Sequence, residues 1–214
     1  MNPRNLNSVT LRTLVVPVVA VALLVLPATG EAQVRFTPQV GAYLPVTDMG
    51  EFRASTSEER REFGRRNSSL AYGASLEFSP PLSPFGIRTT WLYGSDGSVP
   101  LKDVGCDGPC PRSTLLTGSL EAVVRAGLPL VQPHLSLGVA LKRYGFEFEQ
   151  GFPRVIEDQD QWGMQVGVGA TVSVLGMGVA LELSDFIGGL EGADGSSGGR
   201  QHDMFLTLGL ALGR

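Results

Sequence analysis

The chain has 214 residues, of which 28 are glycine and 18 % are charged, and its formal net charge is −4. This length allows one domain of ordinary size or two small ones, and the weakly acidic balance gives no electrostatic reason to expect nucleic-acid binding. Low charge, abundant glycine and many short apolar alternations favour a β-rich protein over a helical one.

The first 32 residues have the features of a cleaved secretory signal peptide. Arg4 and Arg12 supply positive charge, an uncharged run of 15 residues follows at 14–28, and the small residues Gly30 and Ala32 bracket a glutamate. We expect cleavage after Ala32, which leaves residues 33–214 as one exported domain. The alternative is an uncleaved membrane anchor, but the run is shorter than the roughly 20 residues that a membrane-spanning helix needs.

Eight segments of the remaining chain alternate apolar residues with small or polar ones, which is the pattern of a strand with two different faces. Each is about ten residues long, the length that a tilted membrane strand requires. In chain order they are residues 34–45, 70–78, 87–94, 115–126, 133–144, 161–174, 177–186 and 202–214.

The connections between these segments alternate in length. Short turns are expected at 79–85, 127–132 and 175–176, and long loops at 46–69, 95–114, 145–160 and 187–201. Short turns at one end, long loops at the other and both termini at the short-turn end are the layout of an outer-membrane barrel. The last segment has no later partner, so we expect it to close the barrel by antiparallel pairing with residues 34–45.

These segments and connections resemble the small eight-stranded outer-membrane β-barrel proteins, the group of OmpA-like transmembrane and OmpX-like barrels. The resemblance covers residues 33–214 and rests on the pattern, without a diagnostic motif. It implies an all-β fold, an eight-stranded antiparallel up-and-down transmembrane β-barrel in the cell outer membrane. The implied partners are outer-membrane lipid, lipopolysaccharide and the outer-membrane assembly machinery, and no cofactor is expected.

The two faces of the strands distinguish this barrel from a soluble barrel of the lipocalin type, which would turn its Leu/Val face inward. The opposite faces of residues 161–174 and 202–214 carry mostly small residues, which suit the tight interior of an eight-stranded barrel. Aromatic residues near strand ends predict interfacial girdles formed by Phe36, Tyr72, Phe78, Trp91, Tyr93 and Trp162.

Charged side chains on the face opposite the Leu/Val face would be costly in hydrocarbon, so alternation places them in the lumen, where they can pair. The predicted lumen charge network consists of Arg35, Glu77, Arg88, Glu121, Arg125, His134, Lys142 and Glu182. We interpret it as a plug of ion pairs and waters; the alternative is a gated ion path.

Cys106 and Cys110 enclose Asp-Gly-Pro in the second long loop. In an exported protein this spacing predicts a disulfide bond, with a free reactive pair as the alternative. A metal site is not expected, because neither histidine lies near the cysteines in sequence. In the first long loop, Ser57 is a candidate N-cap for a short helix over 58–63. The arginines of that loop are candidates for contacts with lipopolysaccharide phosphates, although a solvated loop is the simpler account.

His134 and Ser136, followed by Glu147 and Glu149, resemble the His-x-Ser pair and later Glu of lipid A deacylases. A histidine oriented by a carboxylate can activate a serine hydroxyl. The placement argues against this chemistry. By parity His134 points into the lumen at the short-turn end, and at about 3.3 Å per residue the two glutamates lie roughly 35 Å or more from Ser136. We therefore do not expect an enzyme.

The sequence thus predicts an outer-membrane barrel with a structural, adhesive or surface-interaction role, carried by the long loops on a plugged barrel. The alternative is a narrow pore for small solutes or ions, and a lipid-modifying hydrolase comes third.

Overall fold

The computed structural model describes residues 33–53, 60–81, 83–100, 110–128, 130–148, 158–174, 177–191 and 197–212. The predicted signal peptide, Ser57, Cys106 and Glu149 lie outside these ranges. The signal peptide and the pairing of Cys106 with Cys110 therefore stay predictions. No helix within the described ranges is long and apolar enough to cross a membrane.

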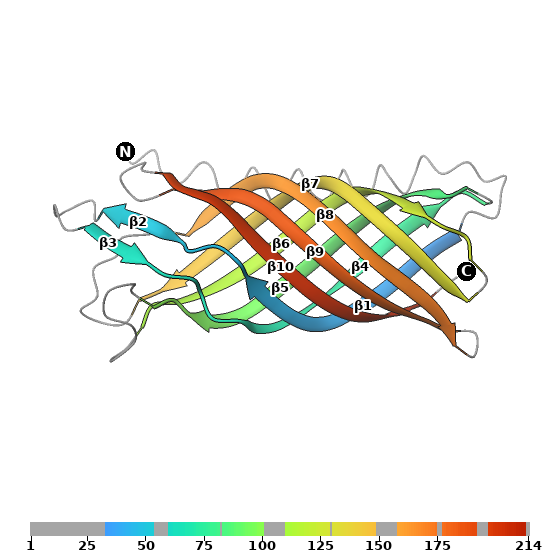
Figure 1. Ribbon diagram of the computed structural model, residues 1–214, viewed down its shortest axis with the longest axis horizontal. Helices are drawn as coiled ribbons and strands as arrows, with labels where there is room; N and C mark the ends of the chain where they lie inside the picture. The colour runs from blue at the N-terminus through green and yellow to red at the C-terminus, as the bar shows by residue number, and fades with distance from the viewer. Residues whose placement is uncertain are drawn as a thin grey trace, which may run out of the picture. The chain divides into compact units, whose positions relative to one another are not determined.

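The described chain is built from strands. They are β1 (Gln33–Pro45), β2 (Gly50–Arg53), β3 (Arg60–Phe63), β4 (Ser69–Ser79), β5 (Phe85–Ser98), β6 (Arg112–Arg125), β7 (Val131–Glu147), β8 (Gln159–Val174), β9 (Met177–Glu191) and β10 (Ser197–Ala211). Eight of these form a closed barrel in the order β1-β10-β9-β8-β7-β6-β5-β4, while β2 and β3 form a separate two-stranded sheet (Figure 1). The predicted eight-stranded antiparallel barrel is confirmed.

The barrel closes where the alternation predicts, because β1 pairs antiparallel with both β10 and β4. Across the seam Leu44 lies opposite Met204. We followed the register from Leu44 of β1 to its partner on β10, and from each strand to the next around the barrel. This path returns to β1 at Val34, which is ten residues before Leu44 in the chain. A stagger of this size in an eight-stranded barrel means that the strands are strongly tilted, by about 40° to the axis.

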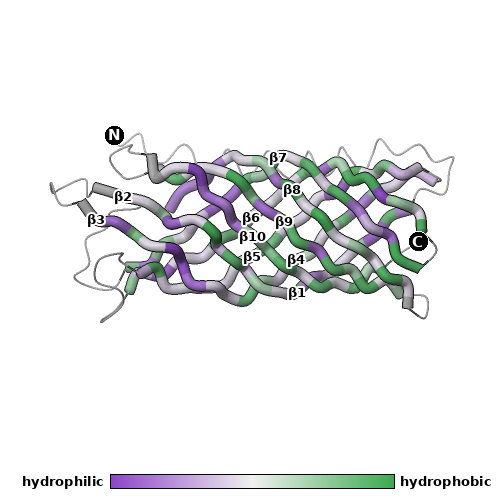
Figure 2. The backbone as a smooth tube through the Cα atoms, in the orientation of Figure 1, coloured by the Kyte–Doolittle hydropathy of each residue, from purple (hydrophilic) through white to green (hydrophobic). Residues whose placement is uncertain are grey.

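The two faces of each strand differ as expected. Apolar side chains point outward and are exposed, and Figure 2 shows hydrophobic and hydrophilic residues alternating along the strands. The exposed set includes Val40, Leu70, Ile87, Leu120, Leu135, Leu137, Val139, Met164, Val168, Leu181, Leu206, Leu208 and Leu210. The opposite face is buried and includes most of the predicted lumen charges.

The strands are longer at the long-loop end than the sequence indicates. β5 continues to Ser98, β9 to Glu191, and β10 begins at Ser197. Trp91 therefore lies in the middle of its strand and not near an end. The alternation of buried and exposed residues continues past the apolar part of the wall, so the strands keep a packed inner face there.

The short helix expected over 58–63 is wrong, because residues 60–63 form strand β3 and pair with β2. Phe63 is fully buried and belongs to the same apolar cluster as Met49 and Val99. Burial of this aromatic side chain stabilises the hairpin, which outweighs the weak local preference for a capped helical turn.

Candidate functional site

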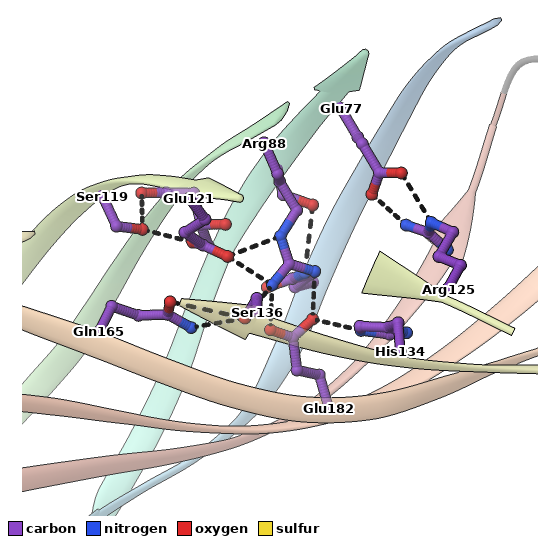
Figure 3. Close-up of polar contacts among 12 residues, drawn as sticks. Glu77, Arg88, Ser119, Glu121, Arg125, His134, Ser136, Gln165 and Glu182 are labelled. Carbon is purple, nitrogen blue, oxygen red and sulfur yellow. Dashed lines mark hydrogen bonds and ion pairs between the residues drawn. The ribbon is translucent and has the colours of Figure 1, made fainter. Parts of the chain in front are cut away.

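An arginine crosses the middle of the lumen. Arg88 on β5 donates to Glu121 Oε2 on β6 from Nε at 2.8 Å and from Nη2 at 2.5 Å. The same guanidinium donates to both oxygens of Glu182 on β9, at 2.6 and 2.5 Å (Figure 3). Strands β5 and β9 are four places apart in the ring of eight, so the Arg88–Glu182 pair joins opposite sides of the barrel.

Neighbouring polar side chains make further hydrogen bonds to Glu121, Glu182 and Arg88. His134 Nε2 lies 3.3 Å from Glu182 Oε2, and Ser119 donates to Glu121 Oε1 at 2.5 Å. Ser136 Oγ accepts from Arg88 Nη2 and from Gln165 Nε2, each at 3.0 Å (Figure 3). Buried charges are tolerated when they are paired and fully hydrogen-bonded, and this cluster meets both conditions for its carboxylates.

A second ion pair lies toward the short-turn end. Arg125 on β6 binds Glu77 on β4 through two nitrogens, with the Nε–Oε1 distance at 2.7 Å. Ser79 donates to the same Glu77 carboxylate at 2.8 Å. Arg35 lies directly across from Glu77 in the β1–β4 register.

A third polar group, centred on Asp203, lies toward the long-loop end. Lys142 Nζ donates to Asp203 Oδ2 at 2.6 Å and to the Phe186 carbonyl at 3.2 Å. The hydroxyls of Tyr43 and Tyr144 donate to the two Asp203 oxygens. Asp203 was not among the predicted lumen charges, although it shares the inward parity of Phe205 and Thr207.

Aromatic side chains fill the lumen around this group, beside the small residues expected on the inner faces of residues 161–174 and 202–214. Phe205 packs against Tyr43 and Phe186, with ring centroids 5.0 and 5.5 Å apart. Arg66, which follows β3, lies 4.4 Å from the centroid of the Tyr43 ring and is buried. The inward position of these aromatic residues could have been predicted from the alternation of their strands. The inward position of Arg66 could not, because Arg66 lies outside every predicted strand.

The structure brings the eight predicted lumen residues into three groups at different depths, and all of them have inward parity. His134 and Ser136, the pair that resembles the His-x-Ser of lipid A deacylases, are both buried in the Arg88 cluster. The proposed girdle residues Phe36, Tyr72, Trp91 and Trp162 are exposed on the outer face, and Tyr72 packs against Tyr93 with ring centroids 5.2 Å apart.

The structure describes one of the two cysteines of the predicted disulfide. Cys110 is disulfide-bonded, and Cys106 lies outside the described residues. Within the described ranges, no group of three or more His, Cys, Asp or Glu side chains is placed to hold a metal ion.

One polar pair on the outer wall was missed. His202 on β10 and Asp185 on β9 have outward parity, and His202 Nδ1 lies 2.7 Å from Asp185 Oδ2. The outward parity of Asp185 among Leu183 and Ile187 was a signal in the sequence. Its pairing with His202 depends on the β9–β10 register.

A closed barrel with an apolar outer face and a hydrogen-bonded polar lumen is the architecture of a transmembrane β-barrel of the outer-membrane type. The outer membrane is the location that this architecture indicates.

Solved structures that are similar to this chain include outer-membrane barrels. The outer-membrane protein AlkL, determined in DMPC lipid bilayers, is 12 % identical with a TM-score of 0.55, and the match covers 88 % of this chain and 93 % of that one. The N-terminal β-barrel domain of Pseudomonas aeruginosa OprF is 13 % identical with a TM-score of 0.49, covering 86 % and 98 %. A major outer-membrane protein of Thermus thermophilus is 16 % identical with a TM-score of 0.44, covering 86 % and 100 %.

No family model matches the chain, and no curated protein matches it in sequence. At these identities the structural likeness shows the fold. The predicted resemblance to small eight-stranded outer-membrane barrels is confirmed at that level.

Proposed function

We propose that the protein is an outer-membrane barrel with a structural or surface-interaction role, whose lumen is closed and whose long loops meet the cell exterior. The observation that carries this proposal is the Arg88–Glu182 ion pair, which joins opposite strands across the middle of the barrel. Eight strands leave an interior just wide enough for side chains, so a crossing guanidinium occupies the space that a solute would need.

The lumen is closed a second time near the long-loop end. Tyr43, Tyr144, Phe186 and Phe205 are fully buried there. The segment after β3 also covers this end, because Gly64 N donates to the Pro100 carbonyl and Asn67 N to the Ser98 carbonyl. A barrel blocked at two depths acts as a rigid support, and binding functions then belong to the loops that it carries.

The partners follow from the location. The apolar outer face meets membrane lipid, lipopolysaccharide surrounds the long-loop end, and the assembly machinery of the outer membrane inserts the chain. Outward-facing ion pairs at the long-loop end, Arg112–Asp96 and Arg143–Asp160, provide charge at the level where lipopolysaccharide phosphates lie.

A second candidate is a narrow path for ions or small solutes. Several buried polar atoms of the lumen have no hydrogen-bond partner within the described residues, among them Thr90 Oγ1, Thr207 Oγ1 and His134 Nδ1. Buried polar atoms are normally satisfied by protein or by water, so water in the lumen is the natural partner for them.

Three measurements on the purified, refolded protein test the proposal and its alternatives. Gel migration before and after boiling should differ, because a folded membrane barrel in detergent is more compact than the boiled chain. Planar bilayers that contain the folded protein should show no steady channel, and a steady open channel would favour the second candidate. Incubation with lipid A should leave its mass unchanged. A mass loss that is abolished by Ser136→Ala would support the hydrolase.

A further inference from the structure

The short-turn end of the barrel exposes apolar side chains beyond the ends of the strands. Leu128 and Leu130, in the connection between β6 and β7, are 53 % and 72 % exposed. Turns that face water are usually polar, and contiguous exposed apolar side chains mark a surface that contacts something else. Two exposed leucines in one short turn therefore indicate a surface that covers them.

Leu130 lies beyond a part of the wall that already has the height of a membrane core. On β8 the outward residues are apolar from Trp162 to Val172, and at about 3.3 Å per residue and a tilt of about 40° this run is roughly 25 Å tall. The apolar band of an outer-membrane barrel has about the same height, 25 Å. Val131 lies opposite Val172 in the register. The Leu130 carbonyl accepts a hydrogen bond from Ser173 N at 3.2 Å, which holds Leu130 one residue past this edge.

The apolar composition recurs at the other short connections of the barrel. No charged residue occurs in the three connections, which are residues 79–85, 127–132 and 175–176. Phe85 at the start of β5 and Met177 at the start of β9 are exposed as well, so apolar side chains lie on several sides of this rim. The long-loop end differs, because outward-facing ion pairs lie there.

We propose that the short connections are immersed in the periplasmic leaflet of the outer membrane and anchor the barrel in its phospholipid. The lipid that covers the wall then also covers the turn, because the exposed apolar surface continues from Val124 through Ala126 to Leu128 without a polar boundary. A bilayer surrounds the barrel and favours apolar connections on all sides, whereas a partner protein or a second copy would cover one side. This inference rests on the proposed function, because it requires the outer wall to lie in lipid.

Immersion of this rim removes the short-turn end as a docking face for soluble proteins of the periplasm. Binding then belongs to the long-loop end, where the connections are longer and carry charged residues. The two ends of the barrel therefore have different tasks, anchoring at one end and recognition at the other.

The test places a single tryptophan in the turn. The two native tryptophans, Trp91 and Trp162, are replaced by phenylalanine, and Leu130→Trp is introduced into the full-length mature chain. The folded protein is studied in phosphatidylcholine nanodiscs, which leave both ends of the barrel open to water. Lipids brominated near the top of their acyl chains should quench most of the fluorescence of the Leu130→Trp reporter, and aqueous iodide should quench little of it.

Glu147→Trp in the same background is the matched control, because Glu147 is exposed and ends the same strand, β7, at the long-loop end. It lies four residues past Arg143 of the outward ion pair, so iodide should quench this reporter and brominated lipid should not. Leu128→Trp is a second reporter for the turn and should behave as Leu130→Trp does. Gel migration without boiling shows which variants are folded.

Iodide quenching of the folded turn reporters to the level of Glu147→Trp would overturn the anchor, because the turn would then lie in water. Protection from iodide without quenching by brominated lipid would show protein, and not lipid, as the cover of the turn and would also overturn it. The variant Trp162→Phe, which keeps Trp91 in the wall, tests the proposed function separately. Brominated lipid should quench Trp91, and an absence of quenching there would contradict the membrane location itself.

Discussion

Arg88 is the side chain on which the lumen network depends most. It is buried and is the cation that faces Glu121 and Glu182. We predict that Arg88→Ala lowers the free energy of unfolding by about 3–5 kcal/mol, because it leaves two buried carboxylates without their shared partner. The measurement is urea unfolding of the refolded barrel in lipid vesicles.

The Arg143–Asp160 pair provides the control for this prediction. It has comparable geometry, with Arg143 Nε and Nη2 each 2.6 Å from a carboxylate oxygen, but Arg143 is exposed. Arg143→Ala should cost only about 0–1 kcal/mol, as exposed ion pairs do. Similar losses in the two variants would mean that the lumen network is no more important than a surface pair.

At the scale of the element, the seam between β1 and β10 depends on a glycine. A Cβ atom on Gly41 would overlap the carbonyl oxygen of Leu206 on the facing strand, so the two backbones can approach only if this side chain is absent. We predict that Gly41→Ala destabilises the folded barrel by about 1–3 kcal/mol through overpacking. The folded fraction on an unboiled gel after refolding measures the effect.

Gly127→Ala is the matched variant, because a Cβ on Gly127 meets no heavy atom within 4 Å. It should refold like the wild type. Unimpaired refolding of Gly41→Ala would show that the seam can move apart to accept a methyl group.

The β2–β3 hairpin is held by the burial of Phe63. This side chain is fully buried with Met49 and Val99, and truncating such a phenylalanine removes about 3–5 kcal/mol of packing. We predict that Phe63→Ala releases the hairpin while the eight-stranded barrel stays folded. Trypsin should then cut faster after Arg53 and Arg60, and the products can be identified by mass.

Val46→Ala, at an exposed apolar residue just after β1, is the comparison and should cleave at the wild-type rate. If Phe63→Ala also loses the migration shift on gels, the hairpin and the barrel unfold together, contrary to this prediction.

For the whole molecule, the apolar outer face determines insertion. Leu208 is the third of the five outward apolar residues from Met204 to Leu212 on β10, near the middle of the apolar face, and it is exposed. Leu208→Lys should cost about 2–4 kcal/mol, the range found for a lysine at the midplane of a bilayer. Vesicle insertion assays at increasing urea should show a lower midpoint.

Val46→Lys, placed at the long-loop end of β1, tests the depth dependence. Its cost should be about 0–1 kcal/mol, because a lysine near the interface reaches water. Equal costs at the two positions would contradict a membrane-embedded wall.

Much of this architecture could be predicted because successive side chains of a strand point to opposite faces, so the two environments alternate with a period of two residues. Alternation located eight strands, indicated which face meets lipid, and identified Arg88, Glu121 and Glu182 as lumen residues without showing that they meet. The closing partner of the last strand followed because antiparallel order leaves one free edge. These properties are local or topological, so the sequence by itself determined them.

Only the tertiary structure decided which side chains meet. Whether Arg88 pairs with a carboxylate on a neighbouring or an opposite strand depends on the stagger of the barrel, which alternation does not encode. The same holds for the Asp203 group, for the pairing of Asp185 with His202, and for β3, where the buried Phe63 outweighed a helical N-cap. Each of these contacts joins residues far apart in the chain or on different strands, and its energy exists only once the barrel has closed.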